Sequence, residues 1–401
     1  MSDVPHLRFP EFSVEWECST IGREFELYSG NTPSRLDKEQ FNGNVNWISS
    51  GELKEHYIYD TKEKITEEAA SCNNLRLLPI GTFVIAIYGL EAEGVRGTGS
   101  VIQKKSTISQ ACMAFSSKGT ITNEFLYSWY KKHGNLIGLK YAQGTKQQNL
   151  SYDIISQFRI SYPSITEQKK LQDFISLIDE RIATQNKIIE KLESLIEGLN
   201  NSLYDRYGDG IRTSFAGLGY SYSGLSGKSA MDFGKGKPFI TYLNVYSNNV
   251  VNENDYQYVQ IDEGEKQNVV QYGDVLFTLS SETPEEVGIG SVYLGQDEVY
   301  LNSFCFGIHI VNEELAYSPY ISYYVSSTPF RKFIYPFAQG STRFNLCKAD
   351  FEKASITLPS LDNQKRIHLV LNSVAMKIST ERAMLEQYVT QKQYLLRQMF
   401  I

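Results

Sequence analysis

After Pro163 the chain carries apolar residues at alternating steps of four and three, and nine of the ten positions are aliphatic. These positions are Leu171, Ile175, Ile178, Ile182, Gln185, Ile189, Leu192, Ile196, Leu199 and Leu203. A heptad pattern of this length predicts a coiled-coil helix. We expect it to run from Thr166 to Leu203, about 57 Å at 1.5 Å per residue, after a capping box formed by Ser164 and Glu167. The polar Gln185 either fixes the register of the seam or lies in a stretch exposed to water.

A second stretch with the same spacing closes the chain. Its positions are Ile367, Leu371, Val374, Ile378, Glu381, Leu385, Tyr388, Lys392, Leu395 and Met399. Glu381 aligns with Gln185, whereas Lys392 departs from the pattern at a point where Val389 and Leu396 could carry the seam. Two helices of matched length in one chain predict that they pair with each other, and we expect the pairing to be antiparallel.

Ahead of each helix, short apolar runs alternate with turns rich in Gly, Asn and Ser. In the first part we expect strands over Val45–Ser49, Thr82–Tyr88, Gly99–Gln103 and Ala111–Ser116. Their counterparts are Phe239–Tyr242, Asp274–Leu279, Ser291–Leu294 and Phe304–Val311. One helix follows in each part, over Glu124–His133 and Ser318–Phe333. The pattern predicts a mixed α+β fold with a largely antiparallel sheet.

One polar phrase occurs twice. YAQGTKQQNL begins at Tyr141, and FAQGSTRFNL begins 196 residues later at Phe337. In the same register, 11 of 42 aligned positions are identical from Tyr141 to Ile182. An internal repeat on this scale predicts two copies of one unit. We therefore expect a globular domain over 1–163, a helix over 164–207, a second globular domain over 208–359 and a final helix over 360–401.

Composition and charge narrow the function classes. No apolar run reaches the length of a membrane span, the first residues do not resemble a signal peptide, and five scattered cysteines without a CxxC motif favour reduced thiols. These features predict a cytoplasmic protein without a metal centre. The net charge of −7 argues against a chain that grips nucleic acid alone through bulk electrostatics. Binding to DNA would need local basic patches or a partner that contributes positive charge.

Two motifs resemble the nucleotide-binding loops of enzymes, but each lacks a feature that such a loop requires. YSGLSGKS, from Tyr222, lacks the first glycine of a phosphate-binding loop. GVRGTGS, from Gly94, is followed by an expected strand where a dinucleotide-binding loop would begin a helix. No nucleophile–base arrangement is evident. We therefore expect no intrinsic catalysis.

The expected loops are rich in planar and hydroxyl side chains, which read base edges and hold phosphates. The DNA-binding candidates are Asn31, Thr32, Ser34, Arg35, Ser49, Ser50, Thr145, Lys146, Gln147, Asn149, Thr241, Tyr242, Asn244, Ser341, Thr342, Arg343 and Asn345. Each could also be a simple turn former. The repeated glycine loops are the stronger candidates, and Lys146 and Arg343 lie one position apart in the alignment, so each loop carries one cation.

A variable domain that ends in G-T/S-x-x-x-N-L, then Pro-Ser-x-x-Glu-Gln-Lys and a long helix, resembles the specificity subunits of type I restriction-modification systems. In this chain the signature is Pro163 to Lys169, and "IGREFELYSGNTPSR", "WISSGELK" and the final "LLRQMF" also look like the family. The second copy departs from it, with Asp362-Asn363 in place of Thr166-Glu167. No counterpart of Trp16 precedes the second domain, so its start falls somewhere in 208–220.

The resemblance implies a non-catalytic reader of double-stranded DNA. Each globular domain would be a target-recognition domain for one half of a bipartite site, and the antiparallel helices would space the halves and dock two modification (methyltransferase) subunits. Restriction subunits, which translocate DNA, would join through these. S-adenosylmethionine, ATP and Mg would be bound by the partners and no cofactor by this chain. The alternative is a protein–protein scaffold with two ligand-binding domains on a coiled-coil spacer and no DNA.

Overall fold

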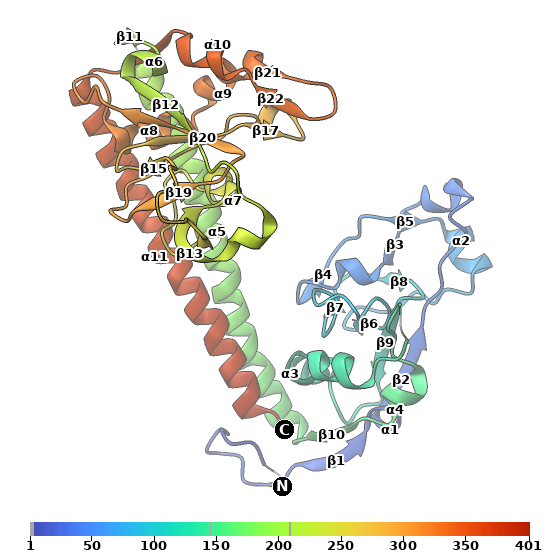
Figure 1. Cartoon of the computed structure of the whole chain (residues 1–401). Coiled ribbons are helices and arrows are strands. Elements are labelled where there is room, and N and C mark those ends of the chain that lie inside the picture. Colours follow the sequence, from blue (N-terminus) through green and yellow to red (C-terminus); the bar gives the residue numbers. More distant parts are fainter. Residues whose placement is uncertain (1–3, 145, 208–209) are drawn as a thin grey trace. The chain divides into compact units, whose positions relative to one another are not determined.

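The computed structural model describes residues 4–144, 146–207 and 210–401. The chain forms two compact units, residues 1–186 with 384–401 and residues 187–383. The division falls inside the two long helices, so each unit combines one globular part with a segment of both helices (Figure 1).

The first unit is built on two sheets, in strand orders β2-β9-β6-β7-β4 and β5-β3-β8. The strands are β2 (Phe25–Ser29), β3 (Val45–Ile48), β4 (Tyr57–Ile58), β5 (Lys64–Ile65), β6 (Phe83–Ala86), β7 (Gly99–Ile102), β8 (Ser106–Ile108) and β9 (Cys112–Ser117). β1 (Glu17–Thr20) pairs separately with β10 (Arg159–Tyr162). The helices of this part are α1 (Ile21–Glu24), α2 (Glu67–Cys72), α3 (Asn123–Tyr141) and α4 (Tyr152–Ser156).

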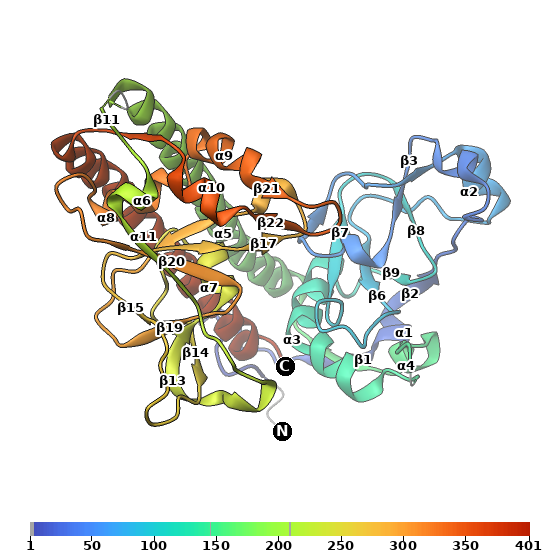
Figure 2. The same ribbon diagram turned by 45° about the horizontal axis from the view of Figure 1, so that its top comes forward.

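The second unit is also built on two sheets, in strand orders β12-β20-β16-β18 and β14-β13-β19-β15. Figure 2 shows its strands β12 and β20, with β13, β14, β15 and β19. Its strands are β12 (Gly219–Ser223), β13 (Phe233–Ile240), β14 (Tyr256–Val259), β15 (Val269–Val270), β16 (Val275–Thr278), β18 (Gly290–Val292), β19 (Val299–Leu301) and β20 (Cys305–Ile310). β11 (Ile211–Thr213) pairs with β23 (Ile356–Leu358), as β1 pairs with β10. The helices are α6 (Phe215–Leu218), α7 (Tyr242–Ser247), α8 (Ser318–Tyr324), α9 (Thr328–Ile334) and α10 (Lys348–Lys353). The predicted internal repeat and mixed fold class are confirmed.

Most strand pairs are antiparallel, as expected. Among the described strands, the parallel pairs are β3 with β8, β4 with β7, and β13 with β19. In both units the main sheet packs its apolar face against the helices that follow it, with Phe83, Phe115 and Phe125 in the first core. The core of the second unit contains Phe277, Phe306 and Phe330.

Three predicted elements were wrong in detail. The helix expected over Ser318–Phe333 is two helices, because Ser327 caps α9 by accepting a hydrogen bond from the Phe330 amide and Pro329 follows in its first turn. The helix expected to end at His133 continues to Tyr141. The strand expected over Phe239–Tyr242 ends at Ile240, because the Thr241 hydroxyl accepts from the Asn244 amide and begins α7.

The long helices are α5 (Ile165–Tyr207) and α11 (Leu361–Met399), and they pair antiparallel as predicted. In the first unit Lys392 of α11 forms an ion pair with Asp179 of α5. In the second unit Arg382 of α11 pairs with Glu193 of α5. The residue numbers therefore increase along α5 in the direction in which they decrease along α11.

All of the predicted seam positions are buried or half-buried. Gln185 is 5% exposed and Glu381 is 6% exposed, which excludes a water-exposed stretch of seam at these two residues. Lys377, one turn before Glu381, pairs with its carboxylate. At Lys392 the alternative Leu396 is buried in the first core, whereas Val389 is 39% exposed and does not carry the seam.

Each long helix is tied to its own domain by a buried glutamine. The Gln168 amide donates to the carbonyls of Thr120 and Pro163, and its oxygen accepts from the Thr122 amide, at 2.9–3.0 Å. In the second unit the Gln364 amide donates to Leu315 and Pro359, and its oxygen accepts from Tyr317, each at 2.8 Å. Both side chains are 0% exposed. The glutamine of each repeated Gln-Lys pair therefore acts as a clamp, by which we mean a buried side chain that holds the long helix against its domain.

The predicted capping box is only half formed. The Ser164 hydroxyl accepts from the Glu167 amide. The Glu167 carboxylate does not accept a hydrogen bond from the Ser164 amide. It accepts two hydrogen bonds from Arg8 instead, each 2.7 Å long. Glu167 therefore fastens the N-terminal segment to the start of α5.

A half-buried histidine, His56, joins the first domain to the helix pair. The His56 ring lies between the rings of Tyr57 and Tyr127, with both centroids 3.9 Å away. Its Nε2 is 2.8 Å from Glu124 Oε2 on α3, and its Nδ1 is 3.4 Å from Asp179 Oδ2 on α5. Burial alone would lower the pKa of His56, but the two carboxylates outweigh burial and raise it.

This arrangement predicts a pH-dependent stability. Because folding raises the pKa of His56, its contribution to stability is complete below the ordinary value of 6.5 and is lost as the pH rises through the raised value. We expect the melting temperature of the first unit to fall over that range, and His56→Gln to remove the fall. Thermal melts from pH 5 to pH 9 test this, with the exposed His6→Gln as the control. An unchanged pH profile in His56→Gln would contradict the assignment.

Candidate nucleic-acid interface

The repeated phrase folds into the same turn in both units. In the first, Gln143 bridges Asn149, and in the second, β21 (Ala338–Gln339) pairs with β22 (Phe344–Leu346) so that Gln339 faces Asn345. The glycines that open the turns have φ values of 122° at Gly144 and 142° at Gly340. Their conformation and tight packing require glycine.

The polar side chains of these turns lie at the surface. Thr145 lies outside the described residues. Lys146, Gln147, Ser341, Thr342, Arg343 and Asn345 are exposed, and Asn149 is half-buried. Within the described parts of the chain, no carboxylate oxygen lies within 4.0 Å of the Lys146 or Arg343 side-chain nitrogens, whereas Arg76 and Lys237 are already ion-paired. The charges of Lys146 and Arg343 therefore remain available to an anionic partner.

A second loop supports each turn. In the first unit the Gln148 amide donates to Glu91 and the Leu90 amide donates to the Gln148 carbonyl, while Arg96 donates to the Leu90 and Glu91 carbonyls. The pattern of residues did not reveal this role of Arg96, because two of its hydrogen bonds go to backbone carbonyls and the third goes to Asn135, 39 residues away.

In the second unit β17 (Ser280–Ser281) pairs with β22. The loop that follows β17 is held by Arg331 of α9, whose guanidinium donates to three carbonyls, those of Glu285, Val287 and Gly288. Arg331 was also missed in the sequence, because its partners lie more than forty residues away.

A groove of about 280 Å³ lies beside the second turn. Its lining residues are Tyr242, Leu243, Tyr246, Ser280, Ser281, Glu282, Glu286 and Arg343. The Tyr242 and Tyr246 rings are nearly parallel, with centroids 6.0 Å apart. Hydrogen bonds from Tyr246 and Ser281 lower the pKa of Glu286 and keep it ionised. Flat rings beside an exposed cation are groups that contact nucleic acids.

The candidates near Asn31 form a second exposed loop of the first unit. Asn31, Ser34 and Arg35 are exposed and Thr32 is half-buried. Arg35 makes an ion pair with Glu63 and lies 4.5 Å from the Phe41 ring centroid. The charge of Arg35 is therefore already balanced within the chain.

Several of the remaining candidates have structural partners. Ser49 caps a short 3₁₀ turn, since its amide and hydroxyl both donate to Glu52, and Ser50 begins that turn. Asn244 is 1% exposed, and its amide donates to the carbonyls of Asn252 and Asp255. Thr241 caps α7. Asn244 is therefore too deeply buried to contact a base, in contrast to its prediction as a DNA-binding residue.

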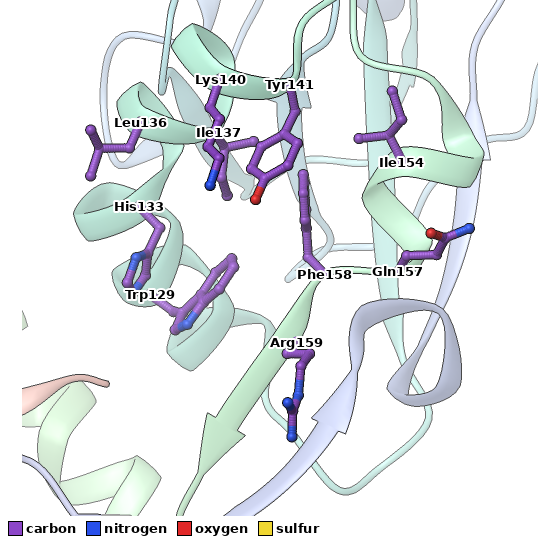
Figure 3. A pocket seen from close by; sticks show the side chains of 10 residues that line it. All are labelled: Trp129, His133, Leu136, Ile137, Lys140, Tyr141, Ile154, Gln157, Phe158 and Arg159. Atoms are coloured by element: carbon purple, nitrogen blue, oxygen red, sulfur yellow. The ribbon is translucent and has the colours of Figure 1, made fainter. Parts of the chain in front are cut away.

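An open pocket in the first unit was not anticipated. It has a volume of about 630 Å³ and is lined by Trp129, His133, Leu136, Ile137, Lys140, Tyr141, Ile154, Gln157, Phe158 and Arg159 (Figure 3). Tyr141 belongs to the repeated phrase, and the Lys140 ammonium lies 5.2 Å from its ring centroid. In the second unit the positions that align with Ile137, Tyr141 and Ile155 are Phe333, Phe337 and Phe351, whose rings pack together.

The described residues contain no group of three or more His, Cys, Asp or Glu side chains placed to hold a metal ion. Among those same residues, no helix has both the length and the apolar character needed to cross a membrane.

Comparison with known families agrees with this arrangement. The family model described as the type I restriction modification DNA specificity domain matches residues 13–194 and 228–388. The chain belongs to this family. The two matched regions correspond to the two copies of the repeat, so the chain carries two specificity domains.

Relatives of known identity are similar over part of their length. The specificity subunit of the type I restriction enzyme MjaIX from Methanocaldococcus jannaschii is 29% identical over 185 residues, which are 44% of this chain and 42% of the relative. That of EcoR124I/EcoR124II from Escherichia coli is 28% identical over 207 residues, 51% of this chain and 49% of the relative. The chain thus spans about half the length of these relatives.

Solved structures share the fold over nearly the whole chain. The S subunit of the type I restriction-modification system from M. genitalium superposes with a TM-score of 0.56 at 15% identity, covering 99% of both chains. A structure solved to explain complex assembly and conformational transition of the type I R-M system gives a TM-score of 0.60 at 13% identity, covering 95% of this chain and 96% of that one. At these identities the likeness concerns the fold alone.

Proposed function

We propose that this chain is the sequence-reading subunit of a type I restriction-modification complex, and that it binds double-stranded DNA. Each specificity domain reads one half of a bipartite target. The observation that carries this proposal is the repeated turn: the same glycine conformation and the same closing pair occur twice, with different exposed polar side chains in the two domains. Different side chains on one frame suit two different half-sites.

The helix pair supplies the second part of the proposal. α5 and α11 each run without a break through both units, so they set the separation of the half-sites and offer a platform for two modification subunits. Restriction subunits join through those. The chain itself is non-catalytic and cytoplasmic, and S-adenosylmethionine, ATP and Mg are bound by the partners. The same proposal divides the chain into two target-recognition domains, over 1–163 and 208–359, and two spacer helices, over 164–207 and 360–401.

The net charge of −7 fits a reader that works inside a complex. Phosphate contacts need Lys and Arg, and many cations of this chain are already paired with carboxylates. Partner subunits that close around the DNA would contribute the remaining positive charge.

The test is binding of duplex DNA by the chain assembled with its modification subunit, together with mapping of methylated adenines in the source cell. We expect a bipartite methylated motif and complex-dependent binding to it. A complex that assembles but binds no DNA would support the alternative, a protein–protein scaffold.

Lys146→Ala is expected to weaken DNA binding by the complex to a similar extent on every sequence. If the ammonium neutralises one phosphate, the slope of log Kobs against log salt should flatten by about one. Lys105→Ala, which removes an exposed lysine from the turn between β7 and β8, is the matched control. Wild-type affinity and salt slope in Lys146→Ala would exclude a phosphate contact at this residue.

A further inference from the structure

Gln147 and Arg343 hold the same position in the two repeated turns. A Cβ built on Gly144 would lie 2.1 Å from the carbonyl oxygen of Gln147, and one built on Gly340 would lie 2.1 Å from that of Arg343. The bridges Gln143–Asn149 and Gln339–Asn345 enclose the two turns in the same register. The structural partner of Arg343 is therefore Gln147, and the partner of Lys146 is Thr342.

The side chains of Gln147 and Arg343 differ in their pattern of hydrogen-bond donors and acceptors. A glutamine amide has one donor group and one acceptor, which match the N6 amino group and N7 of adenine in a bidentate contact. An arginine guanidinium has donors only, which match O6 and N7 of guanine. One geometry can thus present either of the two patterns that distinguish an A·T from a G·C pair in the major groove.

Both side chains are exposed and ready to make such a contact. Within the described residues, neither Gln147 nor Arg343 has a side-chain hydrogen bond or an ion pair, and the guanidinium of Arg343 lies 6.0 Å from the exposed Phe304 ring. In the groove beside Arg343, Glu286 is already held by Tyr246 and Ser281. Since no described residue uses the donors of Arg343, they remain open to a partner outside the chain.

Several contacts hold the described backbone on either side of Gln147 and Arg343. Both turns require their glycine and are closed by a strand pair or bridge. The supporting loops are fixed by Arg96 in the first unit and by Arg331 in the second. A side chain on a fixed frame discriminates between ligands better than one on a mobile loop, because the wrong base cannot be accommodated by movement of the backbone.

We propose that Gln147 and Arg343 are corresponding base-reading residues, with Gln147 reading an adenine in one half-site and Arg343 a guanine in the other. This proposal rests on the proposed function. It goes further by assigning one base of each half-site to one residue and by predicting that the two assignments can be exchanged.

The test exchanges the two side chains one at a time, as Gln147→Arg and Arg343→Gln, in the complex with its modification subunits. Binding is measured by competition on duplexes that carry all four base pairs at each position of the mapped target. Gln147→Arg should change the preferred base at one position of one half-site from adenine to guanine. Arg343→Gln should make the reverse change in the other half-site, and each change should be about 10- to 100-fold.

Neighbouring residues provide the controls. Lys146→Ala and Thr342→Ala should leave every base preference unchanged, because these side chains occupy the other exposed position of the turn. Arg343→Lys keeps the charge but not the planar fork, so it should lose the preference for guanine and retain the salt dependence. Thermal melts establish that each variant is folded.

The outcomes separate this inference from the function on which it rests. No DNA binding by the wild-type complex would overturn the proposed function. Normal binding with unchanged base preference in the folded Arg343→Gln, Arg343→Lys and Gln147→Arg variants would overturn the base-reading assignment alone. A change in both half-sites from one substitution would also contradict it.

Discussion

Gln168→Leu is expected to lower the free energy of unfolding of the first unit by about 3 kcal/mol or more. The leucine keeps the volume close to that of glutamine but leaves the carbonyls of Thr120 and Pro163 and the amide of Thr122 without their partner. Each buried polar group that loses its hydrogen bond costs about 1–3 kcal/mol, and Gln168 is fully buried. Urea unfolding followed by circular dichroism measures the loss.

Matched variants make this result specific. Lys169→Ala changes the exposed neighbour and should alter stability by less than about 0.5 kcal/mol. Gln364→Leu removes the equivalent clamp of the second unit and should destabilise that unit by a similar amount. If Gln168→Leu unfolds at the wild-type urea concentration, the buried glutamine is not a clamp and the loop ahead of α3 is held by other contacts.

Removing one heptad from each long helix is expected to shorten the spacer of the DNA target by about three base pairs. Residues 183–189 and 384–390 lie between the ion pairs Asp179–Lys392 and Glu193–Arg382 on their helices, and deleting seven residues preserves the heptad phase. At 1.5 Å per residue each helix loses about 10.5 Å, and one base pair spans about 3.4 Å. Binding to the original target should fall to the non-specific level.

The readout is methylation or binding on a series of duplexes whose two half-sites are unchanged and whose spacer varies in length. Deleting 183–189 alone is the control, because it leaves the helices mismatched and should destabilise the pair without selecting a shorter spacer. If the doubly shortened protein still prefers the original spacer, the helices do not set the separation of the half-sites. This prediction depends on the proposed function, whereas the one for Gln168 does not.

The elements that carry periodic or repeated signals were predictable from the order of the residues alone. The heptads of α5 and α11 identified both helices because a seam needs an apolar residue every 3.5 residues on average, which is about once per helical turn. The repeat around Gly144 and Gly340 predicted two copies of one fold. The turn keeps glycine at these two positions because their positive φ values favour it. The exposed positions Gln147 and Arg343 were also among its candidates.

Which polar residues hold the fold together, and which stay exposed to a partner, depends on contacts between residues that are distant in the sequence. Gln168, Gln364 and Arg331 bond to backbone groups about 5 to 50 residues away, and Asn244 fills its hydrogen-bonding capacity inside its own loop. A side chain that pairs with distant backbone leaves no periodic pattern in the sequence, since the backbone looks alike at every residue. The same type of polar residue can therefore cap a helix, hold a distant backbone segment or contact a partner. The three-dimensional fold determines which of these roles it has.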